Sequence, residues 1–233
     1  MSPSGDYLGG SFGIVQKEEA RDLMTAALEK RKTTGAFMRS VPTNALAIYG
    51  GKKPQPGSLK LQLAYRDLPR GDVERPNTAY IQNPYNLGWL DISKVEAQTF
   101  LTESEKPIEI PQRLFAKIAT QTLKDAVRGQ MSRWNSSALR SGSLTSQRIS
   151  KDESRSSYRL QGTADLAEEE RSYKAQLHGQ AVYDSSTQAF VEFELVAVGQ
   201  RTGKGGANGR ENDLGPAPMG VAFKLYQSPD TSL

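Results

Sequence analysis

The sequence predicts an α+β fold in which a curved antiparallel sheet, a C-terminal β-meander, has about three helices packed on it. Two observations predict this class. Apolar residues recur every three or four positions in parts of residues 1–135, as in amphipathic helices. Over residues 144–226 they recur at every second position, as in strands that bury one face. Because no longer repeat is visible, we expect residues 1–233 to form a single domain rather than a solenoid or a propeller.

The composition excludes several classes of protein. The chain contains no cysteine, which rules out a disulfide framework, a thiolate nucleophile and cysteine-bound metal. Its 30 Lys and Arg residues exceed its 26 Asp and Glu residues, and a net charge of +4 is too small to require a nucleic-acid partner. No apolar run approaches the roughly 18 residues of a membrane span. We expect no cofactor.

The first residues lack the basic and apolar regions of a signal peptide. We therefore expect the chain to be either intracellular or shown in its mature form.

The first half begins with a predicted helix, a strand and a loop. Residues 16–32 carry an apolar stripe that predicts an amphipathic helix, and Gly35 ends it. Apolar and polar residues alternate from Leu59 to Tyr65, which predicts a half-buried strand. The segment from Pro69 to Leu90 is dense in Pro, Asn and Gly, so we expect a long loop.

Two more helices are predicted before the meander. Ser93 and Glu96 have the spacing of a capping box, which predicts a short helix. Pro111 suits the first turn of a longer helix, which we expect to continue until Gly129. The serine-rich residues 136–146 are interpreted as a connector.

Strands of the meander are predicted at Tyr158–Ala164, Tyr173–Tyr183, Val191–Ala197 and Met219–Leu225. A turn at residues 184–187 would place Tyr183 opposite Ala189. Phe193 would then lie opposite Gly179, where an aromatic ring can cover a strand glycine.

His178 is the only histidine, so a histidine-based acid, base or metal ligand must be this residue. The predicted register places it opposite Glu194 and diagonal to Glu192, which makes these three residues the candidate catalytic group. The favoured alternative is a solvent-facing charged patch, because opposite charges across strands commonly stabilise sheets.

Tyr80, Tyr85 and Trp89 are aromatic residues set among side-chain amides in the predicted long loop. Planar rings beside amide groups are suited to bind a saccharide or a peptide. The same rings can instead anchor the loop to the core, which is the interpretation we favour.

The segment Gly199–Arg210 is glycine-rich and basic, and its Arg201, Lys204 and Arg210 are candidate ligands for an anion. It is not a Walker A loop, because the glycine spacing is wrong and no Ser or Thr follows Lys204. A mobile hairpin tip is the favoured interpretation.

Short motifs in the second half resemble those of a group of uncharacterised, apparently exported bacterial proteins with a helical N-terminal half and a C-terminal antiparallel β-meander. These motifs are Val127–Gly129 with Trp134, Tyr183–Asp184, Phe190, Phe193, Leu195–Ala197 with Gly199, and Pro218–Leu225. The resemblance implies a periplasmic or secreted location and carries no activity.

No motif assigns a reaction or a ligand to the chain. With no cysteine and one histidine, the sequence favours a non-catalytic extracytoplasmic domain with a binding or structural role. The alternative is a hydrolase or metal-assisted enzyme that uses His178 with Glu192 and Glu194.

Overall fold

The computed structural model describes residues 22, 25, 55–70, 85–205 and 208–226. The chain divides into two compact units, one formed by Pro54–Ser228 and the other by residues 1–53 with residues 229–233. Apart from Asp22 and Thr25, which are both helical, the described residues belong to the first unit. The rest of the helix predicted at residues 16–32 lies outside the described residues.

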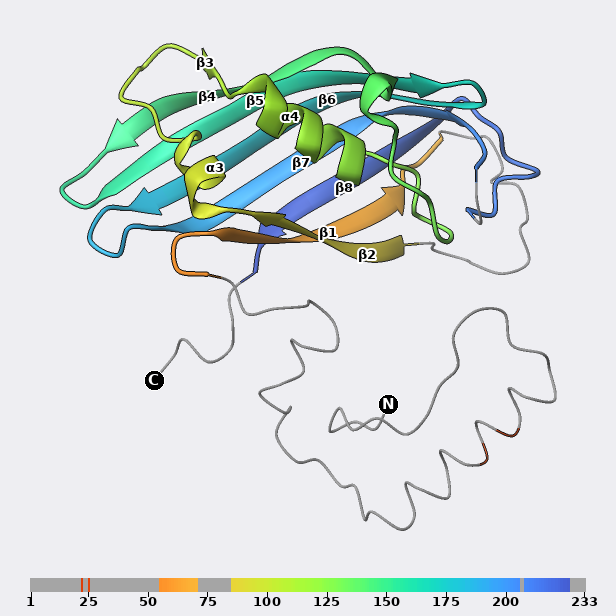
Figure 1. Ribbon diagram of the computed structural model, residues 1–233, viewed down its shortest axis with the longest axis horizontal. Coiled ribbons are helices and arrows are strands. Elements are labelled where there is room, and N and C mark those ends of the chain that lie inside the picture. The colour runs from red at the N-terminus through yellow and green to blue at the C-terminus, as the bar shows by residue number, and fades with distance from the viewer. Residues whose placement is uncertain (1–21, 23–24, 26–54, 71–84, 206–207, 227–233) are drawn as a thin grey trace. The chain divides into compact units, whose positions relative to one another are not determined.

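Eight antiparallel strands form one sheet in the order β2-β1-β8-β7-β6-β5-β4-β3 (Figure 1). The strands are β1 (Leu59–Asp67), β2 (Tyr85–Ile92), β3 (Ile108–Glu109), β4 (Leu139–Lys151), β5 (Arg155–Glu168), β6 (Arg171–Asp184), β7 (Ala189–Gly203) and β8 (Ala217–Leu225). Strands β3 to β8 follow one another along the sheet, so the C-terminal chain is a continuous meander. Strand β1 pairs with β8, and β2 then forms an edge.

Two α-helices lie on the same side of this sheet (Figure 1). Helix α3 (Lys94–Gln98) begins at the predicted capping box, in which Ser93 and Glu96 exchange hydrogen bonds. Helix α4 (Gln112–Thr122) buries one stripe of apolar residues, including Leu114 and Phe115. None of the helices among the described residues is both long and apolar enough to cross a membrane.

The core lies between α4 and one face of the sheet. On β7 the odd-numbered residues from Phe193 to Arg201 face it, and on β1 the odd-numbered residues from Leu59 to Asp67 do the same. Both strands therefore end their core-facing rows on a buried charged residue. The opposite face carries residues that remain exposed, such as Val196 and Val198.

The predicted fold class is wrong. The described residues form a nearly all-β structure with two short helices, not a sheet with about three helices packed on it. The predicted helix up to Gly129 ends at Thr122, because Leu123 leaves helical geometry with ψ of 62°. Beyond it, Asp125 and Arg128 are drawn into buried ion pairs, which compete with further helix.

Two predicted loops are strands. The second part of the expected loop from Pro69 to Leu90 is β2, whose buried Leu90 and Ile92 pair with β1. Much of the predicted serine-rich connector, residues 136–146, belongs to β4 after the short 3₁₀ helix η1 (Ser136–Ala138). In β4, small polar side chains alternate with the buried Leu144, a pattern too weakly apolar for the sequence to reveal.

The predicted strand pairing between β6 and β7 is wrong by two residues, although all four predicted meander strands are confirmed. The turn pairs Asp184, rather than Tyr183, with Ala189, and a β-bulge at Val191 adds one more residue. A shift of two positions keeps every side chain on its face, so the apolar faces still coincide. Gly179 consequently lies opposite Leu195.

Candidate functional site

Seven buried or partly buried charged side chains form one cluster, here named the arginine–aspartate network. Its members are Asp67, Arg70, Asp125, Arg128, Arg201, Arg210 and Asp213. They come from the end of β1 and the residues just after it, the segment after α4, and the end of β7 with its connection to β8. The network therefore ties three separate parts of the chain together at one end of the sheet.

Arg210 is the centre of this network and is 0% exposed. Its Nη2 donates to Asp67 Oδ1 at 2.6 Å and to Asp125 Oδ1 at 2.8 Å. Its Nη1 donates to Asp213 Oδ2 at 3.0 Å. One guanidinium thus serves three carboxylates, which offsets the cost of burying so many charges.

Two aspartates of the network, Asp67 and Asp213, remain ionised. Burial raises the pKa of Asp213, but the hydrogen bond from Arg70 and the charge of Arg201 outweigh it and hold this pKa far below its usual range. Burial likewise raises the pKa of Asp67, and bonds from Arg210 and Arg128 leave it lowered. These two carboxylates therefore carry full negative charges in the folded protein.

Beside the network lies a hollow of about 350 Å³, here named the β2 groove. It runs between strand β2 and the segment that follows α4. The groove is lined by Tyr65, Asn86, Leu87, Gly88, Trp89, Gln121, Lys124, Ala126, Gly129, Gln130 and Met131. Its size is at the low end of the range for small-molecule sites.

Hydrogen bonds fix the wall of the groove opposite β2. The Asn86 side chain donates to the carbonyl of Ala126 at 2.8 Å and to that of Gly129 at 3.3 Å. Lys124 Nζ donates to the carbonyl of Met131 at 2.8 Å. With Asp125 and Arg128 held by the network, residues 123–131 form a rigid wall without helical structure.

Tyr65 and Gly88 shape the floor of the groove. A side chain at position 88 would place its Cβ 3.1 Å from Tyr65 Cε2 and 3.4 Å from the Tyr65 hydroxyl. Glycine therefore leaves room beside the Tyr65 ring, and Tyr65 is itself buried, with 3% of the residue exposed. Burial raises the pKa of Tyr65 well above its usual value, so the hydroxyl stays protonated and can donate.

The structure places the predicted aromatic residues in different settings. Tyr80 lies outside the described residues, and Tyr85 is 68% exposed at the start of β2. Trp89 lines the groove, but its ring packs edge-on against Tyr226, with centroids 5.1 Å apart. Lys60 Nζ lies 5.3 Å from the centroid of the same ring. The anchoring role and the binding role of these residues therefore both stay predictions.

The three predicted anion ligands of the segment Gly199–Arg210 also lie in different settings. Arg201 and Arg210 are buried in the network, where their guanidinium groups face carboxylates, so the interpretation as a mobile tip is wrong for them. Lys204 is exposed and remains the member open to a ligand.

The structure separates the candidate catalytic residues. His178 is exposed and lies opposite Val196 on β7 and Gln161 on β5. Glu194 lies opposite Gln180 instead, and its carboxylate approaches Lys224 to 3.4 Å, while Glu192 lies opposite Val182. The predicted pairing of His178 with Glu194 is therefore wrong, and the catalytic hypothesis stays a prediction without it.

No group of three His, Asp or Glu side chains within the described ranges is placed to hold a metal ion.

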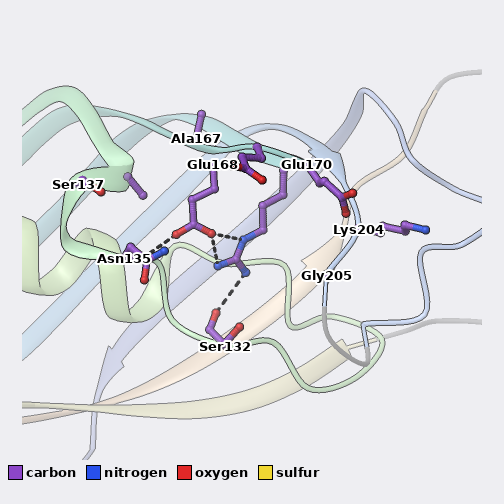
Figure 2. Close-up of a pocket in the computed structure, with 11 residues that line it drawn as sticks. Ser132, Asn135, Ser137, Ala167, Glu168, Glu170, Lys204 and Gly205 are labelled. Carbon is purple, nitrogen blue, oxygen red and sulfur yellow. Dashed lines mark hydrogen bonds and ion pairs between the residues drawn. The ribbon is translucent and has the colours of Figure 1, made fainter.

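A second hollow, of about 610 Å³, lies at the turn between β5 and β6 (Figure 2). Glu168 points toward Asn135 there and accepts its backbone N–H at 2.7 Å. Arg171 bonds to Glu168 and to the carbonyl of Ser132, and its guanidinium lies 4.2 Å from the centre of the Trp134 ring. The charged groups of this hollow therefore hold its own walls together.

The sequence analysis missed both the network and most of the groove. A signal for the network existed, because Asp67 and Arg201 occupy core-facing positions in two alternating strands. A charge at such a position must be paired. The groove had no comparable signal, since Tyr65, Gln121 and Lys124 come from three elements whose approach no local pattern indicates.

No family model, curated protein or solved structure matches the chain. The described residues define a protein class, a domain built on one antiparallel sheet, with the β2 groove beside its arginine–aspartate network.

Proposed function

We propose that the chain is a non-catalytic binding domain and that it holds a small polar ligand, of the saccharide class, in the β2 groove. The supporting observation is the convergence of hydrogen-bonding groups on this hollow. Tyr65, Gln121 and Gln130, which carry a hydroxyl or a side-chain amide, line it together with Lys124. Hydroxyls and amides are the groups that pair with the hydroxyls of a sugar.

The rigidity of the groove supports this proposal. Asn86 holds one wall by two hydrogen bonds to backbone carbonyls, and Asp125 anchors that wall in the network. A wall that is already ordered loses little conformational entropy when a ligand binds. In the second hollow, by contrast, Glu168 and Arg171 are already paired with each other.

We also propose a periplasmic or secreted location. Its support is the resemblance of the second half to exported bacterial proteins. Fractionation of the native host, followed by immunodetection of the protein, tests this part separately. Recovery with cytoplasmic markers would contradict it.

The binding proposal is tested with a panel of monosaccharides and short peptides, measured by isothermal titration calorimetry. We expect saturable binding of at least one saccharide to the wild-type protein. The double variant Gln121→Ala/Gln130→Ala should weaken it by about tenfold, because two hydrogen bonds are lost.

The matched control is Gln176→Ala/Gln180→Ala, which removes two exposed amides from the other face of the sheet. This variant should bind like the wild type. Binding of no saccharide, or an equal loss in both double variants, would contradict the proposal.

A further inference from the structure

Lys124 is the one charged side chain among the residues that line the β2 groove. It is half-buried, and its amine donates one hydrogen bond, to the carbonyl of Met131. No carboxylate of the described residues pairs with it. A partly desolvated ammonium group with only a carbonyl as partner is under-compensated, because a full charge is best stabilised by an opposite charge.

Other partly buried cations of this unit do have carboxylate partners. Lys117 Nζ lies 2.8 Å from Glu96 Oε2, and Arg171 Nη2 lies 2.8 Å from Glu168 Oε2. Arg128 lies at the same distance, 2.8 Å, from Asp67. Lys124 differs from them in facing a hollow instead of a carboxylate.

The field around Lys124 is positive. Burial lowers the pKa of Lys124, and the charges of Arg133 and Arg171 lower it further. Burial and the two arginine charges therefore both disfavour the charged form of the Lys124 amine. A negative charge placed in the groove would favour the charged form again, because it would pair with the ammonium group and offset the charges of Arg133 and Arg171.

From this geometry we infer that the ligand of the β2 groove is a sugar acid, whose carboxylate pairs with Lys124. The inference rests on the proposed binding function and specifies its ligand. The hydroxyls of the sugar ring would then meet the Tyr65 hydroxyl and the amides of Gln121 and Gln130, while the carboxylate meets the ammonium group.

The test compares acid and neutral sugars of the same ring. Calorimetry of the wild-type protein at pH 7 should show D-glucuronate and D-galacturonate binding about tenfold more tightly than D-glucose and D-galactose. In Lys124→Met the acid and neutral sugars should bind with about equal affinity, because the ammonium group that pairs with the carboxylate is gone. Lys174→Met removes an equal charge from an exposed position and should keep the preference.

The outcomes separate this inference from the proposed function. Equal binding of acid and neutral sugars by the wild type overturns the sugar-acid inference and leaves the saccharide proposal standing. A preference that survives in Lys124→Met overturns the role of Lys124. If a capped glutamate peptide binds in a Lys124-dependent way and the sugar acids do not, the carboxylate comes from a peptide, and the saccharide class is wrong.

Discussion

The arginine–aspartate network and the β2 groove share one segment of chain, residues 124–131. They differ in whether the charged side chains of this segment have partners of opposite charge. On one side, Asp125 and Arg128 enter a cluster in which each carboxylate contacts more than one guanidinium. On the other, Lys124 lines a hollow without a carboxylate. Within the network, carboxylates and guanidinium groups pair with one another, whereas Lys124 in the groove has no carboxylate partner among the described residues.

The difference shows how the fold keeps a non-helical wall in place. The segment after α4 has no regular backbone hydrogen bonding, so its order depends on side chains from other elements. Arg210, in the connection between β7 and β8, donates a hydrogen bond to Asp125 of this segment, and Asn86 of β2 donates one to the carbonyl of Ala126. Stability is therefore expected to depend on the network, and binding on the groove.

Removal of Arg210 is expected to have the largest effect. Arg210→Met leaves Asp67, Asp125 and Asp213 buried with too few partners, which should cost about 3–5 kcal/mol of unfolding free energy. Urea unfolding followed by circular dichroism measures this loss. The control is Lys224→Met, which removes an exposed partner of Glu194 and should cost less than about 1 kcal/mol. Equal losses in the two variants would show that the network is not the main support.

Arg70→Met is expected to have a smaller effect that depends on pH. Arg70 donates to both oxygens of Asp213, at 2.8 Å and 2.7 Å, and its loss should cost about 2 kcal/mol at pH 7. Because the pKa values of Asp213 and Asp67 are lowered in the fold, the unfolded chain takes up protons there first, near pH 4. Stability should therefore fall as the pH drops below about 4.

Without Arg70 the pKa of Asp213 should rise, so the contribution of this carboxylate to acid unfolding becomes smaller. Urea midpoints measured from pH 7 to pH 2 should converge between Arg70→Met and the wild type at the acid end. If the urea midpoints of the two proteins instead differed by the same amount at every pH in this range, the role assigned to Asp213 would be contradicted.

Asn86→Ala connects the two regions. Its side chain makes two hydrogen bonds to the carbonyls of Ala126 and Gly129, so the substitution should cost about 1–2 kcal/mol. It should also raise hydrogen-exchange rates of the backbone amides in residues 123–131 above those of the sheet. Unchanged exchange in this segment would mean that the groove wall does not need Asn86.

Gly88→Ala should have the smallest effect on stability and a clear effect on the groove. The added Cβ would meet the Tyr65 ring at 3.1 Å, which the ring can absorb by a small shift, so stability should change by less than about 1 kcal/mol. Saccharide affinity should nevertheless fall by about tenfold, since the methyl group occupies the floor of the site. If Gly88→Ala bound the saccharide as tightly as the wild type does, the ligand would have to bind outside the β2 groove.

Strands with clear alternation could be predicted from the sequence. The strands around Leu61, Leu177 and Phe193 each place apolar residues at every second position, and the structure confirms them. Their register could not be predicted, because the bulge at Val191 leaves no signal in an alternating pattern. Strand β4 was hidden for another reason, since its serines give it little apolar character.

The site could be predicted only in part. The sequence indicated Trp89, which lines the groove, and Arg201 and Arg210, which turn out to be buried in the network. Lys124 could not be singled out, because it lies within the helix predicted to continue until Gly129 and no pattern in the sequence distinguishes it. Lys124 lines the groove because α4 ends at Thr122 and Asp125 pairs with Arg210, and both of these features depend on tertiary contacts.

The most direct test of the central claim is an NMR titration of the ¹⁵N-labelled protein with D-galacturonate. We expect saturable amide shifts concentrated in residues 86–89 and 121–131, and in Tyr65, and in Lys124→Met we expect the same amides to shift only at about tenfold higher D-galacturonate concentrations. Shifts that concentrate instead around His178 and Glu194 on the other face of the sheet, or no saturable shift in the groove, would contradict the account.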